Sequence, residues 1–552
     1  MPHQDDASTS RYRPARGLPF ELREHCLIYW EEELYNQALS LLSSLITSGT
    51  GSTTSSDGPS SAFIPPAQHL ALAATVAIHP SLTTRAPSKE RQSAALNALR
   101  LLRDTNSLVG PINAKFSDAF AFTSSNRARR RHGLGEDSPG SDGESGEAVQ
   151  SAMASEGVWA KADDFWHIVG WAFNCSVLYP GRWKWWKLWL ELMTDVLEAD
   201  WNERQRMYEE AEENGEDDSE AHLSSSLIVH NLPTDRSRLG GNRRVVRAIF
   251  ADGDGRSMAE FKEVFKNETA ERKTDFSALK RKRDTRVNID EEIYADYLDN
   301  PDDDEDDNVA VVDPFGSQPE PPSSPSQSQP GDEPTDPSSD APDDASPLGG
   351  FPALVLRARL LSLLSAVSAA LPTTFLPIDA LYNLYTEHIR PLPLPTFTLL
   401  LSPTLIPLPP AVRITLTQYL LTTLLTPSAP TPPLLRRSTA SPYADALTQA
   451  TLEKCYLPFA ANTASVADNA KVAVCVEALL RLLARYAHVQ PTARLRDAVD
   501  KGVRAREAKA SGDARKGSGK RRVEEEEKAA LRGSGVRMRA LVEVLTEEGE
   551  EG

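Results

Sequence analysis

Side chains able to do acid–base chemistry are present, but their spacing matches no standard catalytic motif. Asp163, Asp164 and His167 share one predicted helix and Glu191 lies on the next, so an enzyme would need all four in one deep pocket. The chain contains no HExxH, no GxSxG, no Rossmann glycine motif and no set of kinase motifs. We therefore expect a protein without catalytic residues, and a helical enzyme with an unrecognised site is the least favoured hypothesis.

Metal and cofactor sites are not indicated either. His167 and Cys175 are eight residues apart, about 12 Å along a helix at 1.5 Å per residue, which is too far for one metal ion. The four cysteines form no CxxC pair and lie in apolar surroundings, as reduced core residues do. Segment 512–520 lacks the GxxxxGK(S/T) motif, and segment 252–256 has Arg256 where a calcium loop needs a ligand. We expect no metal, nucleotide or other cofactor.

Runs of basic residues are the most function-like short motifs. Exposed runs of this kind are bound by nuclear import receptors or contact nucleic acid. The candidate import signal consists of Arg272, Lys273, Lys280, Arg281, Lys282 and Arg283. The acidic sequence that follows it would weaken phosphate binding, so we predict nuclear import and hold direct nucleic-acid binding by this run as the less favoured alternative.

Two further basic segments could contact nucleic acid. Their candidate residues are Arg243, Arg244, Arg247, Lys516, Lys520, Arg521 and Arg522. The first three flank apolar residues, so a surface helix with an apolar inner face is favoured over a phosphate-contacting patch. The others precede the acidic run 524–527, so a solvated loop is favoured there.

Eight of the nine tryptophans lie between Trp159 and Trp201. Proline and glycine after Tyr179 split this stretch into two predicted helices, with Asp163 or Asp164 capping the first. The tryptophans belong either to a core or to a partner's pocket, and the wide apolar arc of the hairpin favours a core. Base stacking is disfavoured because acidic residues outnumber basic ones here. The aromatic candidates are Trp166, Trp171, Trp183, Trp185, Trp186 and Trp189.

The elements around the hairpin are predicted to be helices throughout, because apolar residues recur at helical spacing and no strand-like alternation extends over a useful length. Before the hairpin we expect helices at 19–47, 65–79, 88–104 and 113–122. In the C-terminal part we expect them at 351–371, 377–390, 411–425, 442–457, 465–488, 492–508 and 523–546. The fold class is therefore all-α, and the C-terminal helices could stack as an α-solenoid although no sequence period is measurable.

Composition divides the chain into two helical domains. We expect a disordered tail at 1–18 and an N-terminal helical domain at 19–298, with disordered inserts at 48–61, 124–157 and 203–224. An acidic, proline- and serine-rich linker at 299–350 then leads to a C-terminal helical domain at 351–546, which carries a basic loop at 508–522. An acidic tail at 547–552 follows.

Overall charge disfavours polyanions as the main partner. The net charge is −19, with the acidic excess in the first 350 residues. Uncharged windows at 391–412 and 414–435 have the length of a membrane span, but several prolines interrupt each of them, so no membrane association is expected.

These observations favour a non-enzymatic, mainly nuclear scaffold or adaptor that binds protein partners through helical surfaces and short motifs. Nucleic acid is not the primary partner in this interpretation. The main alternative is a nucleic-acid-associated factor in RNA processing or chromosome maintenance that uses the local basic patches. The identity of the partners, the pathway and the oligomeric state do not follow from the sequence.

Overall fold

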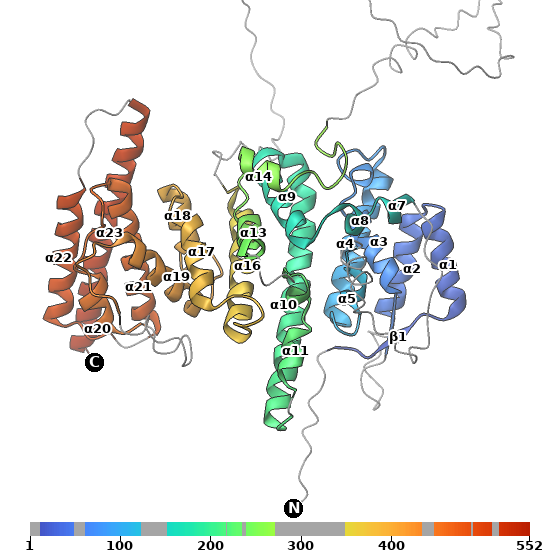
Figure 1. The fold of residues 1–552 in the computed structure, drawn as a ribbon, viewed down its shortest axis with the longest axis horizontal. Helices are drawn as coiled ribbons and strands as arrows, with labels where there is room; N and C mark the ends of the chain where they lie inside the picture. Colours follow the sequence, from blue (N-terminus) through green and yellow to red (C-terminus); the bar gives the residue numbers. More distant parts are fainter. Residues whose placement is uncertain are drawn as a thin grey trace, which may run out of the picture. The chain divides into compact units, whose positions relative to one another are not determined.

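Helices make up almost all of the regular structure in the computed structural model (Figure 1). The structure describes residues 12–48, 61–122, 152–216, 218–233, 239–270, 348–432, 447–486, 489–510 and 518–551. Within them the only sheet pairs two short parallel strands, β1 (Ala15–Gly17) and β2 (Ala62–Ile64). The predicted all-α class is confirmed, whereas a regular solenoid is not.

The first half of the chain contains mostly short helices and one long helix, α10. They are α1 (Phe20–Glu31), α2 (Tyr35–Thr47), α3 (Ala67–Val76), the 3-10 turn η1 (Pro80–Leu82), α4 (Lys89–Leu108), α5 (Phe116–Ala119), α7 (Ala152–Ser155), α8 (Val158–Lys161), α9 (Phe165–Leu178), α10 (Pro180–Glu213), α11 (Glu220–Ser224), α12 (Leu227–His230), α13 (Leu239–Ile249) and α14 (Gly255–Glu260).

The second half begins at a helix that packs on α10. Its elements are α16 (Phe351–Ala370), α17 (Ile378–Ile389), α18 (Leu394–Leu401), α19 (Pro410–Leu424), α20 (Gln449–Thr451), the π-helical turn η4 (Leu452–Tyr456), α21 (Val466–Tyr486), α22 (Ala493–Lys509) and α23 (Ser518–Glu551). Helix α18 was not predicted, because its segment is proline-rich. Its prolines lie before the helix and in its first turn, where a missing N–H breaks no helical hydrogen bond.

Two expectations about the N-terminal part were wrong. The single helix expected at 19–47 is two helices, because Glu33 between them has a φ of 55°, in the left-handed region that a helix cannot contain. Residues 203–213 are not a disordered insert but the end of α10, and α11 covers 220–224. Alternating ion pairs such as Arg206 with Glu203 and Glu210, three and four residues away, support that acidic helix.

The tryptophan hairpin forms as predicted. Helix α9 ends at Leu178 and α10, the long green helix in Figure 1, starts at Pro180. The Asp164 carboxylate caps α9 by accepting the His167 backbone N–H at 2.7 Å. Gly170 on α9 leaves room for the ring of Phe261, which any larger residue would displace. The hairpin is therefore capped by Asp164 and covered by the Phe261 ring.

A buried ion pair holds the segment after α14 against the hairpin. The Arg182 side chain on α10 and the Glu268 carboxylate are both almost fully buried and contact each other directly. Glu268 also accepts the Trp186 indole N–H at 3.1 Å and the backbone N–H groups of Val264 and Phe265. Arg182 donates in addition to the Thr83 hydroxyl at 2.9 Å. Since every charge is compensated, this pair can exist in the interior.

The helices on either side of 271–347 share one core. They belong to one compact unit, and their buried apolar residues form one continuous cluster. Arg357 on α16 donates to the backbone carbonyls of Ile249 and Ala251, and its guanidinium lies 4.0 Å from the centre of the Phe173 ring. The first C-terminal helix, α16, thus packs directly on α10 and α13 of the N-terminal part.

Among the described residues, α16 is also the one helix long and apolar enough to cross a membrane. Of its apolar window, 67% is buried inside the protein. Its burial in the shared core accounts for its apolar composition.

Replacing Arg357 should destabilise the whole fold. In Arg357→Ala, two buried carbonyls lose their donor and a cavity opens beside Phe173, which together should lower the unfolding free energy by about 3 kcal/mol. Arg359→Ala is the matched control: Arg359 pairs with Asp195 at 2.6 Å and with Glu198 at the partly exposed edge, worth about 1 kcal/mol. Urea unfolding measures both variants, and equal losses would contradict the role given to Arg357.

Acid should weaken the fold through buried histidines. Burial lowers the pKa of His69 from 6.5 to about 4, and it has the same effect on His79. Between about pH 6.5 and about pH 4 the unfolded chain binds more protons than the folded one. The free energy of unfolding therefore falls as the pH drops through this range. His69 should contribute about 3 kcal/mol to this loss. His69→Gln should flatten the curve of unfolding free energy against pH, and an unchanged curve would refute the assignment.

Candidate functional site

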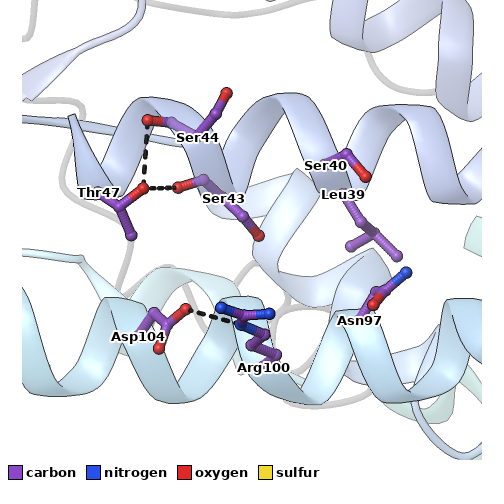
Figure 2. Close-up of a pocket in the computed structure, with 8 residues that line it drawn as sticks. All are labelled: Leu39, Ser40, Ser43, Ser44, Thr47, Asn97, Arg100 and Asp104. Atoms are coloured by element: carbon purple, nitrogen blue, oxygen red, sulfur yellow. Dashed lines mark hydrogen bonds and ion pairs between the residues drawn. The ribbon is translucent and has the colours of Figure 1, made fainter.

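A polar hollow of about 250 Å³ lies on the surface between α2 and α4 (Figure 2). Hydroxyl-bearing residues of α2 line one side, and an amide, a guanidinium and a carboxylate of α4 line the other. Its lining consists of Leu39, Ser40, Ser43, Ser44, Thr47, Asn97, Arg100 and Asp104.

Two of the hydroxyl groups in this hollow donate their protons to carbonyls of their own helix. Ser44 donates to the Leu41 carbonyl at 2.7 Å, and Thr47 donates to the Ser43 carbonyl at 2.8 Å, so their protons point into the helix. The lining contains no histidine that could act as a base for them. The Arg100 side chain is 79% exposed and lies 3.7 Å from Asp104, so this ion pair is weak. The hollow can hydrogen-bond a polar group, but it is not built for covalent catalysis.

Three of the four polar residues that an enzyme would need, Asp163, Asp164 and His167, contact one another at the start of α9, while Glu191 contacts another helix. His167 accepts the Asp163 backbone N–H at Nδ1, 3.2 Å away, so Nε2 carries the proton and donates to the Lys262 carbonyl at 3.0 Å. Asp164 caps α9, and Glu191 lies 3.7 Å from Arg103 on α4. None of the four lines the α2–α4 hollow.

The described residues contain no group of three or more His, Cys, Asp or Glu side chains that could hold a metal ion. All four cysteines are free and buried. Burial raises the pKa of Cys26 to about 11 and also raises that of Cys175 and Cys475, which keeps these thiols protonated and unreactive at neutral pH.

The arginines of α13 are paired with the protein's own acids. Arg247 makes two parallel hydrogen bonds of 2.7 Å to Glu260, and Arg244 contacts Asp164 and lies 4.0 Å from the same glutamate. Arg243 is 4.0 Å from Glu387 on α17. The predicted apolar inner face is present, since Val245, Val246 and Ile249 of this helix are buried. The geometry favours a structural role over phosphate contact.

Most of the other basic candidates lie in segments that the structure does not describe. Arg272, Lys273, Lys280, Arg281, Lys282, Arg283 and Lys516 lie outside the described residues. Lys520 lies on α23, and Arg521 and Arg522 are exposed at the start of that helix. Arg522 is 3.3 Å from Glu526, one turn further along.

The tryptophan candidates lie in the core. Trp166, Trp171, Trp185, Trp186 and Trp189 are at most 4% exposed, whereas Trp183 is half-buried beside Phe173. Several indole N–H groups donate to backbone carbonyls: Trp166 to Asn231 at 2.8 Å and Trp189 to Ala74 at 3.1 Å. A buried indole with its donor satisfied is positioned to hold helices together, not to insert into a partner.

Sequence reasoning missed the large apolar side chains that remain exposed, which occur on the first and last helices and also at Leu96, Leu178, Phe351, Leu405 and Tyr486. On and after α1 these are Phe20 (62%), Ile28 (51%) and Leu34 (40%), and on α23 they are Val523, Val536 and Val544. The sequence did carry a signal for this exposure, because segment 20–34 contains more apolar residues than one buried helix face can hold.

The chain has no recognised relatives in two comparisons. No protein-family model matches it, and no curated protein matches it.

If the α13 arginines are structural, removing them should reduce stability without changing affinity for polyanions. Arg244→Ala with Arg247→Ala should lower the unfolding free energy by about 2 kcal/mol, since each partly buried pair contributes about 1 kcal/mol. The salt concentration that elutes the protein from heparin should stay the same. Arg521→Ala with Arg522→Ala, at exposed positions, is the control with the same charge change. Earlier elution of the α13 variant alone would contradict the structural assignment.

Proposed function

We propose that this protein is a non-enzymatic scaffold or adaptor that acts mainly in the nucleus and holds other proteins together through helical surfaces. The observation that carries the proposal is that large apolar side chains remain exposed on several of the described helices, among them α1, α4, α16, α21 and α23. Such side chains exposed to water favour a protein partner.

The shared core supports this function physically. Arg357, Arg359 and the apolar cluster join the helices before and after 271–347 into one unit, so α1 and α23 belong to one folded body. A body with ordered surfaces loses less conformational entropy on binding than separate flexible modules would. The basic run Lys280 to Arg283 is the basis for proposing a nuclear location.

Native purification of the tagged, full-length protein tests this function. The protein should be isolated separately from nuclear and cytoplasmic fractions, each with and without nuclease, and its partners identified by mass spectrometry. Stoichiometric proteins that persist in the nuclear fraction after nuclease treatment are the expected result. Loss of these partners on nuclease treatment would instead favour the nucleic-acid-associated factor, and a mainly cytoplasmic protein would refute the nuclear part.

A further inference from the structure

We propose that Arg506, inside the junction of η4, α22 and α23, is the centre of a binding site for a small inorganic anion of the size of chloride. Figure 1 shows α22 and α23 side by side near the C-terminus, and η4 packs on α22. Such a site would be independent of the proposed scaffold function. It would give a buried part of the fold a ligand that no sequence motif indicates.

The side chain of Arg506 is fully buried, and only part of it is hydrogen-bonded. Its Nη1 group donates to the backbone carbonyls of Leu457 at 3.0 Å and Phe459 at 3.1 Å. Its Nε and Nη2 groups are buried as well, and no protein atom in the described part of the chain accepts a hydrogen bond from either. Buried donors without an acceptor are destabilising, so a ligand that accepts from both groups would stabilise this junction.

The two unpaired groups of Arg506 are the ones that arginine uses to bind anions. Nε and Nη2 form one edge of the planar guanidinium, so their N–H bonds point the same way and can hold one acceptor between them. The protein uses this edge elsewhere to bind carboxylates. Arg247 donates through Nε and Nη2 to Glu260, and Arg537 donates through the same two groups to Glu477. The edge of Arg506 thus has the donor geometry of an anion site.

The positive charge of Arg506 has no acidic partner among the described residues. Burial lowers the pKa of Arg506 to about 10, so the guanidinium is protonated at neutral pH. The neighbouring Glu507 is exposed on the outside of α22 and makes no ion pair with it. Arg357, also buried, has the face of Phe173 against it, whereas the described contacts of Arg506 are with carbonyls alone. An anion would supply the compensation that a buried charge requires.

Close packing of α22 against both of its neighbours holds Arg506 in place. Gly502, one turn before it, leaves room for a backbone carbonyl just after η4, which a Cβ would strike. On α23, Gly535 leaves room for the Val503 side chain in the same way. Ser534, next to that contact, is fully buried, and its hydroxyl has no partner among the described residues. Because Val503 is one turn from Arg506, the Ser534 hydroxyl is placed to be a third donor to the anion.

Burial and charge together decide the class of ligand. Arg506 and Ser534 are both 0% exposed, so a carboxylate of a partner protein or a phosphate of nucleic acid has no access to them. A water molecule would accept the hydrogen bonds but would leave the positive charge uncompensated. A monatomic anion both accepts the hydrogen bonds and compensates the charge, and it occupies little space.

Thermal unfolding of the full-length protein in mixtures of sodium chloride and sodium gluconate tests the site. The total salt is kept constant while chloride replaces gluconate, an organic anion too large for an enclosed site. A ligand that binds only the folded state raises the melting temperature. Over about a hundredfold increase in chloride, we expect a rise in the parent of about 2 °C or more relative to Arg506→Gln. Bromide should act in the same way, and an equal response of the parent and Arg506→Gln would overturn the proposal.

Arg504→Gln is the matched control, because it makes the same change at an exposed position of the same helix. It should respond to chloride as the parent does, whereas Ser534→Ala should respond less. If Arg506→Gln does not fold, crystals of the parent grown with bromide decide. An anomalous scattering peak in contact with Nε and Nη2 of Arg506 is the expected result. An ordered water molecule at that place, with no such peak, would overturn the anion site.

Discussion

The union of the two halves of the chain depends on the buried side chain of Arg357. Its guanidinium has no carboxylate partner among the described residues. Two backbone carbonyls and the face of Phe173 replace the water that this charge loses. Burial lowers its pKa to about 9, which still leaves it protonated at neutral pH. Because carbonyls at and just after the end of α13 and a ring on α9 receive this side chain together, Arg357 ties α16 to both elements.

The tryptophan hairpin supplies the platform for this docking. Glu268 is held by Arg182 and Trp186 of α10, and Gly349 packs against Ser176 of α9 with a φ of 77° that glycine adopts without strain. The chain is thus anchored to this hairpin on either side of 271–347, through Glu268 before the segment and Gly349 after it.

Local patterns were sufficient for some elements and not for others. The α9–α10 break and the Asp164 cap followed from proline and aspartate, whose backbone preferences act within a few residues. The break at Glu33 carries no proline or glycine; its backbone is left-handed, and the helices on either side of it, α1 and α2, pack on each other. Residues 203–213 were misassigned because their acidic composition suggested disorder, whereas i,i+3 and i,i+4 ion pairs and the preceding buried turns extend the helix.

By itself, the sequence determined that the protein is helical, that its tryptophans lie on a hairpin and that its reactive side chains follow no catalytic spacing, because periodicity and motif spacing are properties of neighbouring residues. Only the tertiary structure decided that the halves share a core, that Arg244 and Arg247 are neutralised by Asp164 and Glu260, and that Phe20 and Ile28 stay exposed. These outcomes depend on which helices meet, and the pairing of distant side chains leaves no local period along the chain.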